Sequence, residues 1–156
     1  MSKAVDLRMA PAEVAFQRQI LVALNADPRR GLFWRQNSGV IVHEATASSR
    51  GRVFRGAPPG AADIVGIASP DGLHVEVEVK VGAAWTTKQH EWQKRVLLHG
   101  GVYVLVRYDR KLWPVKNIAR TVELVDVAIS DRRQLLTRGK NEEQRDDQES
   151  SVSADS

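Results

Sequence analysis

The sequence contains no cysteine, which excludes several kinds of site. Without a thiol the chain can form no disulfide framework, no thiolate zinc site and no cysteine nucleophile. A fold must therefore be held together by packing, and a domain of 156 residues can bury roughly two thirds of its unfolded surface. The absence of cysteine also fits the reducing cytoplasm, which is the compartment we expect.

Long apolar segments are missing as well. No run approaches the roughly 18 apolar residues that a membrane-spanning helix needs. The residues that follow Met1 include no apolar stretch of signal-peptide length. We therefore expect neither a membrane protein nor a secreted one.

Charge is unevenly distributed along the chain. Residues 140–156 hold six acidic and two basic residues, a balance of −4, which leaves +8 for residues 1–139 of the +4 total. Because only Val152 and Ala154 are apolar in the last segment, we predict one domain over residues 1–139 and a disordered acidic tail over residues 140–156. A basic body favours a polyanionic partner, since Lys and Arg neutralise phosphates and release counterions.

The order of periodic segments is typical of an α/β fold. Helical spacing covers residues 11–26 and 86–99, and strand patterns cover residues 32–37, 62–68, 73–80 and 102–106. The Pro70-Asp71-Gly72 turn predicts an antiparallel hairpin, and the helix at 86–99 predicts a parallel crossover to the strand after it. The remaining expectations are a long loop or irregular hairpin at 38–60, strand or helix at 121–127, and a short helix at 130–138.

Two carboxylates and a lysine fall at one end of the predicted hairpin. Glu78 and Lys80 project from the same face because side chains alternate along a strand, and Asp63 opens the partner strand. Paired carboxylates suit magnesium, which activates water, and a nearby lysine can orient that water or offset charge on a phosphate. The alternative is a solvated sheet face with a cross-strand ion pair, and Glu76 could replace Glu78 in another register.

Two further polar residues lie on apolar stripes of the predicted helices. Glu13 shares a stripe with Phe16, so its carboxylate would face the core and need a metal or a partner, unless it is a first-turn acid favoured by the helix dipole. Gln89 shares a stripe with Trp92 but also lies at capping-box spacing from Thr86. Both interpretations remain open for each residue.

Four motifs follow one another between residues 60 and 107. They are GAADIVGI at 60–67, VEVK at 77–80, TKQ at 87–89 with Trp92, and GGVYVLVR at 100–107. In this order, with Glu13 upstream, they resemble the VRR-NUC nucleases of the PD-(D/E)xK superfamily. The resemblance implies a restriction-endonuclease-like core, in which a central mixed β-sheet is flanked by α-helices.

The same resemblance implies an activity. Family members of this kind are metal-dependent deoxyribonucleases, so we expect hydrolysis of DNA phosphodiester bonds by a structure-specific endonuclease acting on branched, flapped or Holliday-junction DNA. The cofactor would be Mg²⁺ or Mn²⁺, and the protein would be a homodimer in a bacterial cell or a phage-infected host.

Site residues can be carried over where the motifs match. The metal-binding groups would be Asp63, Glu78, the Val79 carbonyl and Glu13. Lys80 would be the catalytic lysine, and Gln89 would match the glutamine that follows the lysine motif. Ala62 stands where the superfamily motif has a proline, a departure that leaves the metal ligands in place.

Candidate DNA contacts are basic or polar residues before the first motif. They are Arg35, Asn37, Arg50, Arg52 and Arg55. The first two resemble polar positions of the first strand in this family, although an exposed strand face is equally compatible with them. The three clustered arginines suit contacts to phosphates, which position a duplex without reading its bases.

Two other classes of protein remain open on the sequence. A non-catalytic nucleic-acid-binding module could keep this fold and use only basic residues, but it has no physical need for the complete Asp, Glu and Lys set. A partner-docking subunit could instead use the acidic tail. Incubating a duplex and a four-way junction with magnesium, manganese or chelator would separate a nuclease from both.

Overall fold

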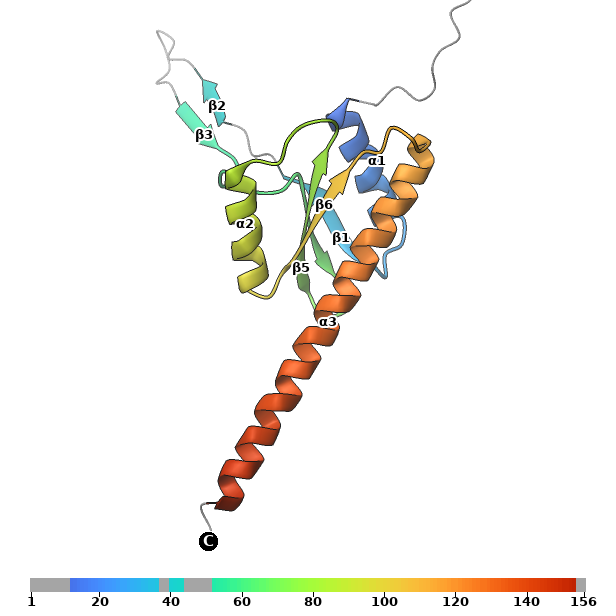
Figure 1. The fold of residues 1–156 in the computed structure, drawn as a ribbon. Coiled ribbons are helices and arrows are strands. Elements are labelled where there is room, and N and C mark those ends of the chain that lie inside the picture. Colours follow the sequence, from blue (N-terminus) through green and yellow to red (C-terminus); the bar gives the residue numbers. More distant parts are fainter. Residues whose placement is uncertain (1–11, 37–39, 44–51, 154–156) are drawn as a thin grey trace, which may run out of the picture.

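The computed structural model describes residues 12–36, 40–43 and 52–153 (Figure 1). For residues 40–43, 52–55, 140 and 142–153 only the backbone is described. The elements are α1 (Glu13–Asn25), β1 (Gly31–Arg35), β2 (Val40–His43), β3 (Arg52–Arg55), β4 (Ile64–Ala68), β5 (Leu73–Lys80), α2 (Thr87–Leu98), β6 (Val102–Arg107) and α3 (Pro114–Ser153).

A four-stranded mixed sheet in the order β1-β4-β5-β6 forms the centre of the fold. The β1–β4 and β4–β5 pairs are antiparallel, whereas β5 and β6 are parallel. The predicted hairpin and the predicted parallel crossover are therefore both confirmed, and the protein is of the mixed α/β class. A separate antiparallel pair, β2–β3, lies in the segment for which the sequence allows an irregular hairpin.

Helices cover the two faces of this sheet (Figure 1). The apolar stripe of α1, formed by Phe16, Ile20 and Leu24, packs with residues of α3 against the valines of β5 and β6. On the opposite face α2 packs through Val96 against Tyr103. Because alternate residues of a strand point to opposite faces, this arrangement turns the polar side chains of β5 toward α2.

The polar face of β5 is buried. Glu76, Glu78 and Lys80 are only 2%, 1% and 8% exposed. This burial contradicts the interpretation of these residues as a solvated sheet face. Each buried charge then needs a hydrogen-bond partner, an opposite charge or a metal ion.

The C-terminal region differs from the sequence-based prediction. A single 40-residue helix, α3, unites the segments at 121–127 and 130–138 and continues through residues 140–153, where we expected a disordered tail. The last turns extend away from the body (Figure 1). Residues 140–153 include three Glu, two Gln, one Lys and one Arg, which have high helix propensity, so local preference at these positions favours helix where apolar anchors are absent. No helix in the described part of the chain is long and apolar enough to cross a membrane.

Close packing between β1 and β4 gives a test of this sheet. Gly66 pairs with Phe33, and an added Cβ at Gly66 would overlap the Phe33 ring, which is buried. We expect Gly66→Ala to lower the free energy of unfolding by about 1–3 kcal/mol, as overpacking does. Gly139→Ala is the control, because nothing lies within 4 Å of its added Cβ, and it should raise stability by up to about 1 kcal/mol in the helix. Thermal unfolding followed by circular dichroism measures both, and an unchanged melting temperature for Gly66→Ala would contradict the packing.

Candidate active site

Asp63 and Glu78 meet where the β4–β5 hairpin opens. The register pairs Ile64 with Val77, which places the preceding Asp63 next to Glu78. Asp63 Oδ2 accepts a hydrogen bond of 2.9 Å from the backbone N–H of Val79. This contact ties the carboxylate to β5, and the Val79 carbonyl, the predicted further ligand, follows in the same strand between Glu78 and Lys80.

Glu13 joins this end of the sheet from α1. It is the first residue of the helix, and its Oε2 accepts a hydrogen bond of 3.1 Å from the backbone N–H of Val81, just beyond β5. Its side chain is partly buried. Glu13 is thus a first-turn acid with a backbone partner on the sheet, and its charge raises the pKa of both Asp63 and Glu78.

Glu78 is the most enclosed carboxylate of the group. Its Oε1 forms an ion pair with Lys80 Nζ at 2.7 Å and accepts a hydrogen bond from Gln89 Nε2. Its Oε2 is buried and has no hydrogen-bond partner in the described structure. Leaving a buried carboxylate oxygen unpaired is costly, and a divalent cation would remove that cost. The donor set therefore fits a magnesium or manganese ion.

The pKa values of the two carboxyls are raised. Burial raises the pKa of Glu78 to about 7, against the lowering effect of the Lys80 ammonium and with a further increase from the Asp63 charge. Burial also raises the pKa of Asp63, while its hydrogen bond from Val79 and the Lys80 charge lower it. A cation bound between the carboxyls would reverse both shifts, because it favours their charged forms.

Gln89 fulfils both functions that its position in the sequence allows. Its side-chain carbonyl accepts a hydrogen bond of 2.9 Å from the Thr86 N–H, and its own backbone N–H donates to Thr86 Oγ1 at 3.3 Å, which completes a capping box at the start of α2. Its amide nitrogen donates to Glu78 Oε1. The N-terminus of α2 is thereby linked directly to the candidate metal ligand.

Glu76 has a different set of partners. Its carboxylate accepts hydrogen bonds from Trp92 Nε1 at 2.6 Å and from the Ala62 N–H at 3.3 Å, and His74 Nε2 lies 3.0 Å from its other oxygen. Both oxygens are satisfied within the protein. Glu76 therefore anchors α2 to the sheet, and nothing in its surroundings favours it over Glu78 as a ligand.

Among the candidate DNA contacts, Arg35 has a described side chain. It ends β1, is exposed, and its charge lowers the pKa of Asp63, so it lies within electrostatic reach of the carboxylates. Arg52 and Arg55 bound β3, but their side chains lie outside the described structure. Asn37 and Arg50 lie outside the described residues altogether.

Arg107 is a basic residue near the site that the sequence does not single out. It pairs with Lys80 across the parallel β5–β6 ladder and is exposed. Residues paired in this way project from the same face of a sheet, so Arg107 is a neighbour of Lys80. The available signal was a basic residue at the end of an otherwise apolar strand, which becomes informative only once the register is known.

Comparisons with known proteins do not assign this chain to a family. No protein-family model matches the chain, and a comparison with curated proteins also gives no match. Within the described residues no three His, Asp or Glu side chains form a ready metal cluster. Magnesium commonly binds through one or two carboxylates and keeps several waters, so the Asp63 and Glu78 pair is sufficient for it.

The raised pKa of Glu78 leads to a prediction for the metal-free protein. Its folded pKa of about 7 exceeds the ordinary value of 4.5, so its contribution to stability is fully present below pH 4.5 and is lost as the pH rises through 7. With chelator present, the melting temperature should therefore fall across this range, and Glu78→Gln, which cannot ionise, should reduce the fall. Magnesium should stabilise the wild type most above pH 7, because ligation requires the ionised carboxylate. Scanning calorimetry measures these curves, and identical profiles for the wild type and Glu78→Gln would contradict titration of Glu78 in this range.

Proposed function

We propose that this protein is a divalent-metal-dependent nuclease that hydrolyses DNA phosphodiester bonds on a restriction-endonuclease-like core. The observation that carries the proposal is the buried, unpaired Oε2 of Glu78 beside Asp63 and Lys80. A purely structural ion pair would have no reason to leave one carboxylate oxygen without a partner in the interior. A metal site gives that oxygen a function.

Asp63 and Glu78 would hold the ion, with the Val79 carbonyl and Glu13 as additional oxygen groups on the same side. When bound, Mg²⁺ or Mn²⁺ would supply an activated water and offset charge on the phosphate. Lys80, now 2.7 Å from Glu78, would orient the attacking water or donate a hydrogen bond to a phosphate oxygen. Gln89 would hold Glu78 in place through its amide nitrogen.

Ala62 stands where the superfamily motif has a proline, and a hydrogen bond explains why alanine suits this position. The Ala62 N–H donates a hydrogen bond to the buried Glu76 carboxylate. A proline has no N–H to donate, so in this chain it would remove one of the groups that satisfy Glu76. Alanine at this position therefore supports the anchoring of α2 without altering the Asp63 and Glu78 pair.

Substrate shape is the finer part of the proposal. From the family resemblance we propose a structure-specific endonuclease, acting as a homodimer on branched, flapped or Holliday-junction DNA. The alternative is a non-catalytic nucleic-acid-binding module on the same fold. The unpaired Glu78 oxygen disfavours that alternative, because a module that binds only through basic residues would gain nothing from it.

Substitution of the acidic pair and the lysine tests the function directly. Asp63→Asn, Glu78→Gln and Lys80→Ala should each reduce magnesium-dependent cleavage of a four-way junction by at least about 100-fold, since each removes a group that acts in the transition state. Glu91→Gln, at an exposed carboxylate of α2, is the control and should cut like the wild type. Cleavage is followed on labelled DNA by gel electrophoresis. Activity that persists in both carboxylate variants would refute the site.

The two functions of Gln89 can be separated by a second pair of variants. Gln89→Ala removes the hydrogen bond to Glu78 and should weaken magnesium affinity by about 10- to 100-fold, as loss of a ligand-orienting contact does. Thr86→Ala removes the hydroxyl of the capping box, with its 3.1 Å hydrogen bond to the Gln89 side-chain carbonyl, and should cost about 1 kcal/mol of stability. The Thr86 N–H still donates to that carbonyl at 2.9 Å, and the hydrogen bond from Gln89 to Glu78 is kept. Its magnesium affinity, measured by calorimetric titration, should remain that of the wild type. Equal affinities for all three proteins would show that Gln89 does not position the carboxylate.

A further inference from the structure

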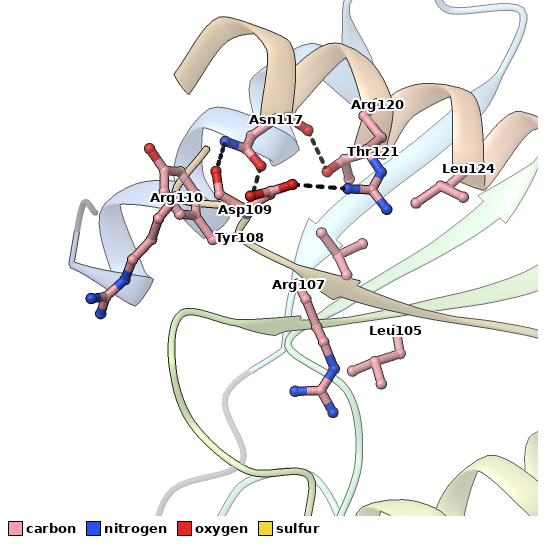
Figure 2. A pocket seen from close by; sticks show the side chains of 10 residues that line it. Leu105, Arg107, Tyr108, Asp109, Arg110, Asn117, Arg120, Thr121 and Leu124 are labelled. Carbon is pink, nitrogen blue, oxygen red and sulfur yellow. Dashed lines mark hydrogen bonds and ion pairs between the residues drawn. The ribbon is translucent and has the colours of Figure 1, made fainter. Parts of the chain in front are cut away.

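A cleft of about 400 Å³ follows the outer side of β6 at its carboxyl end (Figure 2). One wall is the end of the strand and the loop after it, including Arg107 and Arg110. The other wall is the first part of α3, including Asn117 and Arg120. Among the described strands β6 pairs only with β5, so this side of the strand has no neighbouring strand to fill the cleft.

Positive charge dominates the lining of the cleft. Its charged residues are Arg107, Arg110, Arg120 and Asp109. The one acidic residue of the lining, Asp109, already has partners within the protein. Its Oδ1 accepts a hydrogen bond of 2.8 Å from the Lys111 N–H, and its Oδ2 lies 3.9 Å from Arg120 Nη1. Arg107 and Arg110 have no ion pair with any described residue. Figure 2 shows the Arg107 side chain on the side of β6 away from α3, and the Arg110 side chain directed away from Asn117 and Arg120. Both guanidinium groups are therefore open to an anion at the edge of the cleft rather than between its walls.

The loop that follows β6 and carries Arg110 is held in a fixed conformation. Asn117 is 3% exposed, and its side chain accepts a hydrogen bond of 2.8 Å from the Asp109 N–H while donating one of 3.0 Å to the Asp109 carbonyl. Figure 2 shows these bonds joining the loop to α3. The walls of the cleft are thus preorganised, which reduces the ordering cost of binding.

Arg107 connects the edge of the cleft to the candidate active site. Arg107 is the in-register neighbour of Lys80, and the Tyr108 N–H donates a hydrogen bond of 2.9 Å to the Lys80 carbonyl. Arg110 Nη2 lies 3.6 Å from the position of a Cβ added at Gly82, two residues beyond the lysine. The two unpaired arginines therefore lead outward from the lysine along the end of the sheet.

Building on the proposed nuclease function, we propose that Arg107 and Arg110, at the edge of this cleft, bind backbone phosphates of the DNA strand adjacent to the phosphate cut at Lys80. Arg107 and Arg110 would contact these phosphates, and Arg120 would extend the positive surface along α3. Guanidinium groups suit this role because they contact phosphate oxygens through paired donors. An acidic peptide would match the charge of the cleft, but its position beside the catalytic lysine favours the substrate's own phosphates.

The test measures DNA binding without cleavage. Full-length protein with chelator is titrated into a fluorescein-labelled 20-nucleotide single strand, and anisotropy gives Kd at several salt concentrations. Arg107→Ala and Arg110→Ala should each weaken binding and reduce the slope of log affinity against log salt by about 0.7, the value for one phosphate contact on a single strand. Arg107→Lys should keep the wild-type slope. Arg138→Ala, at an exposed arginine farther along α3, is the matched control and should also keep it.

The outcomes separate this assignment from the nuclease proposal. Slopes that are unchanged in both alanine variants, or a wild type that does not bind the strand, would overturn the phosphate assignment even if the protein cuts DNA with magnesium. Arginine-dependent binding by a wild type that cuts no DNA structure would support the cleft while refuting the nuclease. A labelled hexaglutamate peptide that binds more tightly than DNA, and loses affinity with the same substitutions, would overturn the assignment in favour of an acidic peptide.

Discussion

Burial of charged side chains on one face of β5 is the constraint on which this half of the molecule depends. The strand places its valines in the main core and turns Glu76, Glu78 and Lys80 toward α2, where water cannot satisfy them. Their partners come from α2 and the segments around it, through Trp92 for Glu76 and Gln89 for Glu78. Because a lost partner would leave a buried charge, these contacts determine where α2 can lie. The helix position and the geometry of the candidate site are consequently set by the same hydrogen bonds.

Neighbouring carboxylates on this strand thus have different tasks. Glu76 is fully satisfied by protein groups and holds the structure together, whereas Glu78, two residues on, keeps one oxygen without a donor. The difference arises from what each carboxylate meets across the sheet and on α2, since the two residues share a strand face and a side-chain type. Glu76 is held by protein groups and lies beside Glu78, which has one oxygen free of protein donors. Preorganised ligands are usually supported by such well-held neighbours.

Much of this architecture was predictable from periodicity. Alternation at 73–80, the turn at Pro70-Asp71-Gly72 and the helix before the last strand were enough to predict the hairpin, the parallel crossover and the meeting of Asp63 with Glu78. Burial of the polar face was not predictable, because alternation looks the same whether a helix or water covers the second face. The separate tasks of Glu76 and Glu78, like the proximity of Arg107 to Lys80, depend on contacts between elements. The continuity of α3 depends on local helix propensity, which a count of apolar residues does not reveal.

The length of α3 also has an electrostatic consequence. An α-helix rises about 1.5 Å per residue, so residues 140–153 span about 21 Å beyond the part of the helix that packs on the body. Ionic screening in physiological salt acts over about 8 Å, so most of the negative charge in this segment is electrically isolated from the basic domain. A flexible segment of the same composition could fold back and neutralise nearby arginines. Held as a helix, it adds acid to the chain while leaving the positive potential around the carboxylate site nearly undiminished.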